Sequence, residues 1–108
     1  MSRNIATAYV RFVQIAGGKR RPIFIVSETD REITFYNITT KYVNKSDYIK
    51  KWYFEIKDYE STGLKKHSWI DTYNRYSLIK KSTRIDYIGK LSDEDTSRLR
   101  QFLARLPK

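Results

Sequence analysis

Two side chains in this sequence could act together on a phosphodiester, those of Arg21 and Thr39. An arginine presents a fixed fork of donors, which can stabilise the negative charge that develops when a phosphorus centre is attacked. A threonine hydroxyl can donate a hydrogen bond to a non-bridging phosphate oxygen or help to relay a proton. Metal-free cleavage of RNA needs such groups, with a base near the 2′-hydroxyl and an acid near the leaving 5′-oxygen. The fold must bring these side chains together for that chemistry to occur.

Arg21 stands where a basic segment meets an apolar one. Residues 17–21 read Gly-Gly-Lys-Arg-Arg, and the run Pro-Ile-Phe-Ile-Val follows. Proline costs little at the first position of a strand, so this run predicts a buried strand over residues 22–26 that holds Arg21 in place. A hairpin turn that only keeps its charges in water would give the same pattern.

Thr39 follows the next predicted strand. Residues 29–32 form a polar turn, and residues 33–38 read Ile-Thr-Phe-Tyr-Asn-Ile, which predicts a second strand that pairs with the first as a hairpin. If these two strands pair, Arg21 and Thr39 lie at the same edge of the sheet.

The rest of the chain supports a mainly β fold in one domain over residues 1–108. Alternating or apolar patterns predict further strands at 8–13, 52–56, 68–71 and 84–91, while 41–51 is either a loop or a short surface helix. The period changes after Ser92, which is placed to cap a helix with an acidic first turn. Leu99, Phe102, Leu103 and Leu106 form the apolar stripe of that helix, and Pro107 closes it.

The net charge indicates an anionic partner. The chain has 22 Lys and Arg against 12 Asp and Glu, a formal charge of +10, which attracts nucleic acid, an acidic membrane or an acidic protein. Aromatic residues beside the cations could stack on bases while lysines contact phosphates. Alternatively, the aromatics pack in the core and the lysines only keep the protein soluble. The basic groups are 19–21, 41–45, 50–51, 65–66 and 80–81, and the aromatics are Tyr42, Tyr48, Trp52, Tyr53 and Trp69.

Several classes of site are disfavoured by composition. There is no cysteine and a single histidine, His67, so thiolate chemistry and a two-histidine site within one subunit are excluded. The carboxylates are scattered, and we therefore expect no metal and no cofactor. The sequence has no run of transmembrane length and no signal-peptide pattern at its start, so we expect a cytoplasmic protein that does not enter a membrane.

Four segments, in this order, resemble the MazF/PemK toxin family, which includes Kid-like and CcdB-like proteins. Arg21-Pro22 precedes an apolar strand, and residues 38–41, Ile-Thr-Thr-Lys, close the next one. Residues 63–72 resemble the family's entry into a strand that ends in an acidic residue, and residues 89–95 resemble its junction with the last helix. The resemblance extends from Ala8 to Leu106.

The resemblance implies an SH3-like, partly open β-barrel with a C-terminal helix, and a homodimer that acts as the toxin of a type II toxin–antitoxin pair. Most such toxins are metal-independent endoribonucleases that cut single-stranded RNA at short motifs and leave 2′,3′-cyclic phosphate and 5′-hydroxyl ends. By this likeness Arg21 and Thr39 match the catalytic arginine and threonine, and Asp71 lies near an acidic residue used as a base or for substrate contact. The expected partners are single-stranded RNA and a cognate acidic antitoxin. Further RNA contacts are expected from Lys19, Arg20, Thr40, Lys41, Lys65, Lys66, His67 and Trp69.

The sequence also departs from the family pattern. Only residues 14–20 separate the first predicted strand from Arg21, where the family has a long loop over the substrate groove, and Arg75 matches a family arginine only in a shifted position. His67 could donate a proton or could be a surface or packing residue. Fold does not fix function, so two alternatives stay open: a non-catalytic barrel that binds nucleic acid, and a toxin fold that acts on a protein such as gyrase.

Overall fold

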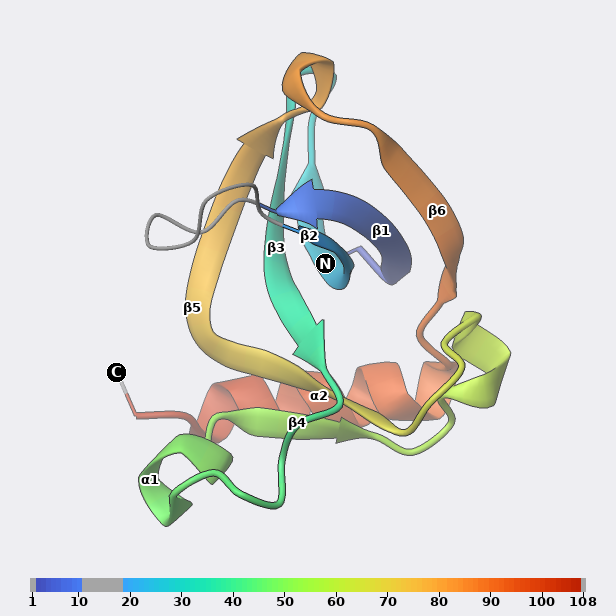
Figure 1. The fold of residues 1–108 in the computed structure, drawn as a ribbon. Helices are drawn as coiled ribbons and strands as arrows, with labels where there is room; N and C mark the ends of the chain where they lie inside the picture. The colour runs from blue at the N-terminus through green and yellow to red at the C-terminus, as the bar shows by residue number, and fades with distance from the viewer. Residues whose placement is uncertain (1, 11–18, 108) are drawn as a thin grey trace.

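One antiparallel sheet of six strands makes up most of the fold (Figure 1). The computed structural model describes residues 2–10 and 19–107. The strand order is β4-β5-β3-β2-β1-β6, so β4 and β6 are the outer strands and the sheet is not closed. The strands are β1 (Asn4–Val10), β2 (Lys19–Glu28), β3 (Glu32–Thr39), β4 (Tyr53–Ile56), β5 (Ser68–Ile79) and β6 (Ile85–Lys90).

The helices lie at the ends of the strands, and the longest of them, α2 (Asp93–Arg105), runs beside β4. The others are single turns: α1 (Asp47–Lys50) and the 3-10 turns η1 (Glu60–Thr62) and η2 (Lys80–Ser82). The expectation of a mainly β chain with a C-terminal helix is confirmed. Among the helices of the described residues, none is long and apolar enough to cross a membrane.

The sheet bends where its ladders change register. Phe35 on β3 pairs with Tyr76 on β5, but Asn37 pairs with Asp71, so residues 72–75 of β5 stand opposite Tyr36 alone. Smaller shifts occur in the β2–β3 and β1–β6 ladders. Extra residues of this kind bend and twist a strand. Figure 1 shows the result as a sharp curve in β5.

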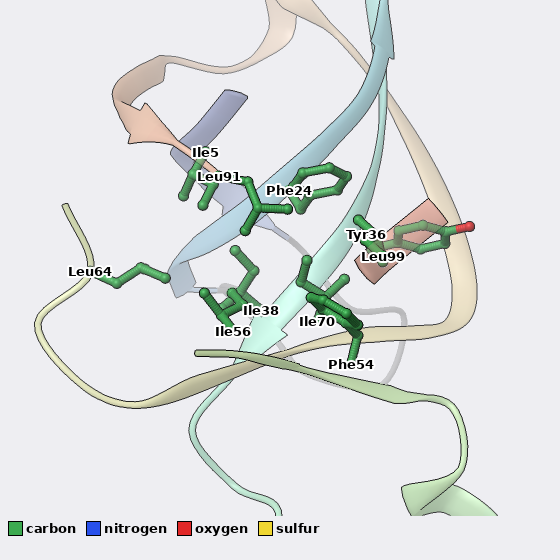
Figure 2. Close-up of a cluster of buried hydrophobic side chains, with 10 residues drawn as sticks. All are labelled: Ile5, Phe24, Tyr36, Ile38, Phe54, Ile56, Leu64, Ile70, Leu91 and Leu99. Carbon is green, nitrogen blue, oxygen red and sulfur yellow. The ribbon is translucent and has the colours of Figure 1, made fainter. Parts of the chain in front are cut away.

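Two apolar clusters hold the sheet in shape. The larger lies between the sheet and α2, with Phe54 edge-to-face against Phe102 at 5.6 Å between ring centroids. Figure 2 shows its ten buried members: Ile5, Phe24, Tyr36, Ile38, Phe54, Ile56, Leu64, Ile70, Leu91 and Leu99. The second consists of Ala6, Ala8, Ile23, Ile25, Ile33 and Phe35.

Strand β2 contributes to both clusters. Ile23 and Ile25 belong to the second cluster and Phe24 to the larger one, and all three are fully buried. Burial of such a side chain stabilises the fold by about 1.5–3 kcal/mol. Both faces of β2 are therefore covered, which explains why its sequence is an unbroken apolar run and does not alternate.

Helix α2 begins and packs as the sequence predicts. The Ser92 hydroxyl accepts a hydrogen bond from the Asp95 backbone N–H at 3.1 Å, as in an N-cap. Leu99 is fully buried in the larger cluster, and Phe102 and Leu103 pack against it. Leu106 is the C-cap, so the helix ends one residue earlier than its apolar stripe.

Several predicted elements differ in extent, and β2 (Lys19–Glu28) is longer at both ends than the predicted 22–26, so that Arg21 lies within the strand. The first strand begins at Asn4 instead of Ala8, and the part of that prediction beyond Val10 lies outside the described residues. Strand β5 has 12 residues where the pattern predicted four, because the polar residues at its bend hide its continuation. The 41–51 segment contains the short helix α1, one of its two predicted forms.

Two glycines allow η1 to pack against β6. Gly63 has a φ of 85°, a backbone conformation that other residues rarely adopt. A Cβ atom on Gly63 would lie 2.4 Å from the Ile88 carbonyl oxygen, and one on Gly89 would lie 2.2 Å from the Thr62 carbonyl oxygen. The two segments thus approach each other backbone to backbone, which leaves no room for a side chain.

We predict that Gly89→Ala lowers the free energy of unfolding by about 1–3 kcal/mol, because the new methyl group collides with the Thr62 carbonyl. Urea denaturation measures the change. Ser97→Ala, at an exposed position of α2, is the control and should alter stability by no more than about 0.5 kcal/mol. Equal stability of the two variants would contradict the close packing of η1 on β6.

Candidate active site

Two adjoining rows of the sheet carry Thr39 and Asp71. Thr39 on β3 pairs with Trp69 on β5, and two residues along the same strands Asn37 pairs with Asp71. Paired residues in a sheet point to the same side, and so do residues two apart on one strand. The four side chains therefore share one face of the sheet, with Thr39 one row from Asp71.

Arg21 lies on that same face. Ile23 on β2 pairs with Asn37 on the antiparallel strand β3. Arg21 precedes Ile23 by two residues, and Thr39 follows Asn37 by two residues. Continuing this register sets Arg21 across from Thr39 at the end of the β2–β3 hairpin. Its other neighbour in the sheet is Ala8 on β1, and its side chain is half-buried. The fold thus brings Arg21, Thr39 and Asp71 to one region.

The carboxyl group of Asp71 is half-buried, which raises its pKa above the ordinary value. A hydrogen bond from the Tyr73 backbone N–H, 3.0 Å from Oδ1, and the charge of Lys45 oppose this rise only in part. The pKa of Tyr53, its partner on β4, is also raised, first by burial and then by the charge of Asp71. A carboxylate whose pKa moves toward neutrality is a better general base at neutral pH.

The hydroxyl group of Thr39 is fixed by its own loop. Its Oγ1 accepts a hydrogen bond from the Lys41 backbone N–H at 3.1 Å. Because that bond uses a lone pair of the oxygen, the hydroxyl proton remains available for a second acceptor. Thr40 and Lys41, which follow, are exposed beside it. A phosphate oxygen is an acceptor that this arrangement suits.

Trp69 stands in a column of stacked rings. One face of the indole stacks on Tyr42, with centroids 4.8 Å apart and planes 2° from parallel. The other face stacks on His67 at 4.5 Å, and His67 in turn stacks on Tyr59 at 5.7 Å. The His67 Nε2 atom lies 2.9 Å from the Glu55 carboxylate. A base can therefore stack on Trp69 only if Tyr42 or His67 moves.

The remaining residues predicted to contact RNA are dispersed. Arg20 lies on the opposite face of β2 from Arg21, where its guanidinium pairs with Asp86 and donates to the Thr7 carbonyl. Lys19 begins β2, and its side chain lies outside the described part of the structure. Lys65 and Lys66 are exposed in the segment that leads to His67. The predicted loop at 14–20 lies outside the described residues except for its last two positions.

Asn37 belongs to the site but is absent from the sequence prediction. It stands between Ile23 and Asp71 in its row, and its Oδ1 atom is buried without a hydrogen-bond partner among the described residues. Reading β3 with period two from Thr39 would have found it, because Asn37 is the preceding residue on the same face. Its amide adds a further hydrogen-bonding group beside the Asp71 carboxyl.

The assembled face offers a guanidinium, a hydroxyl and a carboxyl of raised pKa within two rows, together with aromatic rings. These groups can bind an anion and accept a proton.

Within residues 2–10 and 19–107, no cluster of three or more His, Asp or Glu could hold a metal ion. Among known proteins, no family model matches the chain and no curated protein is similar enough to count as a match.

We predict that Asp71→Asn gains stability relative to the wild type as the pH rises from about 4 to about 7. Because burial raises the pKa of Asp71 in the folded state, the wild type loses stability as this carboxyl ionises, whereas asparagine does not ionise. The asparagine oxygen can still accept from the Tyr73 N–H. Urea unfolding at both pH values measures the difference, and an unchanged or opposite trend would contradict burial as the dominant cause.

Proposed function

We propose that this protein is a metal-independent endoribonuclease of the MazF/PemK toxin type, with an SH3-like, partly open barrel. The observation that carries the proposal is the shared face of Arg21, Thr39 and Asp71 in adjoining rows of the sheet. The resemblance of the sequence to this family supports the same residues independently. The substrate is single-stranded RNA, whose phosphates suit the formal charge of +10.

In the proposed reaction the 2′-oxygen of the substrate attacks the adjacent phosphorus. The Asp71 carboxylate takes the 2′-hydroxyl proton, which its raised pKa favours. Arg21 and Thr39 hold the non-bridging oxygens and stabilise their growing charge. The bond from phosphorus to the 5′-oxygen breaks, and that oxygen takes a proton from solvent water. The products are a 2′,3′-cyclic phosphate end and a 5′-hydroxyl end.

The proposed partners follow from the family likeness and the charge. A cognate antitoxin with an acidic segment would be attracted by the same field that attracts RNA. A homodimer belongs to the proposal on the family likeness alone, and a cytoplasmic location is kept as the expectation from the sequence. The reaction as written requires no metal and no cofactor, because its charge stabilisation comes from side chains.

A second candidate is a barrel that binds nucleic acid without cutting it. The observation that favours it is the contact of cations with tyrosine rings: Lys51 Nζ lies 4.2 Å from the ring centroid of the exposed Tyr48, and Lys50 Nζ lies 5.0 Å from that of the half-buried Tyr42. Aromatic rings flanked by lysines suit sequence-tolerant binding of single strands. This candidate predicts strongly salt-dependent binding and no cleavage product.

We predict that Arg21→Ala lowers the rate of RNA cleavage by about a hundredfold to a thousandfold, because the guanidinium stabilises transition-state charge. The assay incubates a long RNA with the protein in EDTA and maps the ends of the products. Arg31→Ala, an exposed arginine in the turn at the far end of the hairpin, is the matched control and should cut at the wild-type rate. Circular dichroism checks that both variants fold. Undiminished cleavage by Arg21→Ala would rule out its catalytic role, and no cleavage by the wild type would favour the second candidate.

We predict that Thr39→Val lowers kcat by about tenfold to a hundredfold while the fold is kept, because valine preserves the β-branched shape and removes the hydroxyl that donates to the substrate. Loss of the bond from the Lys41 N–H should cost about 1 kcal/mol of stability. Thr34→Val, on the same strand, removes a hydroxyl that contacts Ser77 and is the control for stability alone. If both valine variants cut RNA equally fast, Thr39 takes no part in the reaction.

A further inference from the structure

The outer strand β4 and the C-terminal half of α2 frame an open groove of about 810 Å³. Tyr53, Phe54 and Glu55 line it from the strand, and Arg98, Phe102 and Arg105 line it from the helix. In Figure 1 the two elements run side by side, β4 in green and α2 in red. We propose that this groove binds an extended acidic peptide segment of another protein, which pairs with β4 as an added strand.

The backbone of β4 is set for such pairing. The Thr72 backbone N–H donates to the Trp52 carbonyl at 3.0 Å, which fixes the alternation along the β4–β5 ladder. By that alternation Phe54 and Ile56 bond toward β5, whereas the N–H and C=O groups of Tyr53 and Glu55 point to the outer side. Outward N–H and C=O groups of this kind on an outer strand are the template that an extended peptide uses when it extends a sheet.

Within the described residues, one of these outward groups has a hydrogen-bond partner, and it confirms this direction. Arg98 on α2 donates to the Glu55 carbonyl across a long distance of 3.4 Å. This contact covers the Glu55 end of the edge. The N–H and C=O of Tyr53 and the N–H of Glu55 have no hydrogen-bond partner in the part of the chain that the structure describes, so they are left for an incoming strand, which would enter from the Tyr53 end.

The floor of the groove is apolar. Phe54 is buried, and its ring meets Phe102 edge to face. Leu106 continues this surface at the end of the helix, and Tyr42 and Trp69 close the opposite side. In an added strand every second side chain would face this floor, so the peptide should carry apolar residues at alternate positions.

The charges of the groove favour an acidic peptide. Lys51, Arg98 and Arg105 line it against a single acid, Glu55, which already pairs with His67. Arg98 pairs with the buried Asp95, but Lys51 and Arg105 have no ion-pair partner among the described residues. Carboxylates on the peptide would supply the missing counter-charges.

A peptide fits these features better than RNA does. A nucleic acid strand offers no alternating N–H and C=O groups to pair with the outward groups of Tyr53 and Glu55. The proposal concerns the sheet edge and does not depend on nuclease activity, although the groove shares Trp69 and Tyr53 with the rows of the candidate active site.

The first experiment selects peptides from a random dodecapeptide display library against the full-length protein. We expect enriched sequences that alternate Asp or Glu with apolar residues. A synthetic peptide of the enriched sequence should bind the double variant Lys51→Glu/Arg105→Glu at least about tenfold more weakly than the wild type. Arg100→Glu, an exposed arginine of α2 that does not line the groove, is the control and should bind normally. Enrichment of no acidic sequence, or equal binding to the double variant, overturns the proposal.

The second experiment tests the strand pairing itself. Two peptides are compared, one N-methylated on its odd-numbered residues and one on its even-numbered residues. One of them should lose binding and the other should keep it, because only every second N–H faces β4. Amide hydrogen exchange should slow at Tyr53 and Glu55 when the peptide is bound and stay unchanged at Phe54 and Ile56. Binding that is indifferent to the methylation phase overturns strand addition. Protection of the same two amides by single-stranded RNA, with no effect of any peptide, assigns the edge to nucleic acid and also overturns it.

Discussion

The register between β2, β3 and β5 is the constraint on which the site depends. A slip of one residue in a β ladder turns every side chain to the other face, so Arg21, Thr39 and Asp71 share a face only in this alignment. The alignment is held by burial: Ile23 and Ile25 enter one cluster and Phe24 the other, and a slip would exchange these environments. The core therefore fixes the position of polar groups that contribute little to it.

The bend in β5 lets one strand serve two purposes. Before the bend, Trp69 and Asp71 lie in the rows of the candidate site; after it, Tyr76 and Leu78 pack against the second cluster. Between these two halves β5 has three more residues than the paired part of β3. Because three is an odd number, the alternation of side chains along β5 shifts by one, and Tyr76 faces the same side of the sheet as Asp71. Asn37, whose buried side-chain oxygen has no hydrogen-bond partner among the described residues, lies at this step, where the regular pairing resumes. Irregular pairing beside a group of functional side chains is a common use of bulges.

The parts that sequence could predict are those governed by local pattern. The hairpin of β2 and β3 follows from an apolar run, a polar turn and a second run, and its geometry carries Arg21 and Thr39 to one end. The cap and apolar stripe of α2 are local signals in the same way. The sequence did not predict the length of β5 or the stacked column Tyr42–Trp69–His67–Tyr59, because both depend on contacts between segments distant in the chain. Arg20 shows the same limit, since its partner Asp86 lies 66 residues away.

The two outer strands of the sheet, β4 and β6, differ in what lies beside them, and the difference bears on the proposed binding surface. Strand β6 has η1 packed against Ile88 and Gly89 near its end, so closely that a side chain at Gly63 or Gly89 would collide with backbone atoms. Strand β4 borders the groove with α2, where Arg98 is the one arginine of the described residues that reaches its outer carbonyl. Proteins usually cover or blunt a strand edge, because an open one recruits other chains. The outer N–H and C=O groups of β4 lie beside lysine, arginine and aromatic side chains, and in the proposal above a partner peptide is what pairs with them.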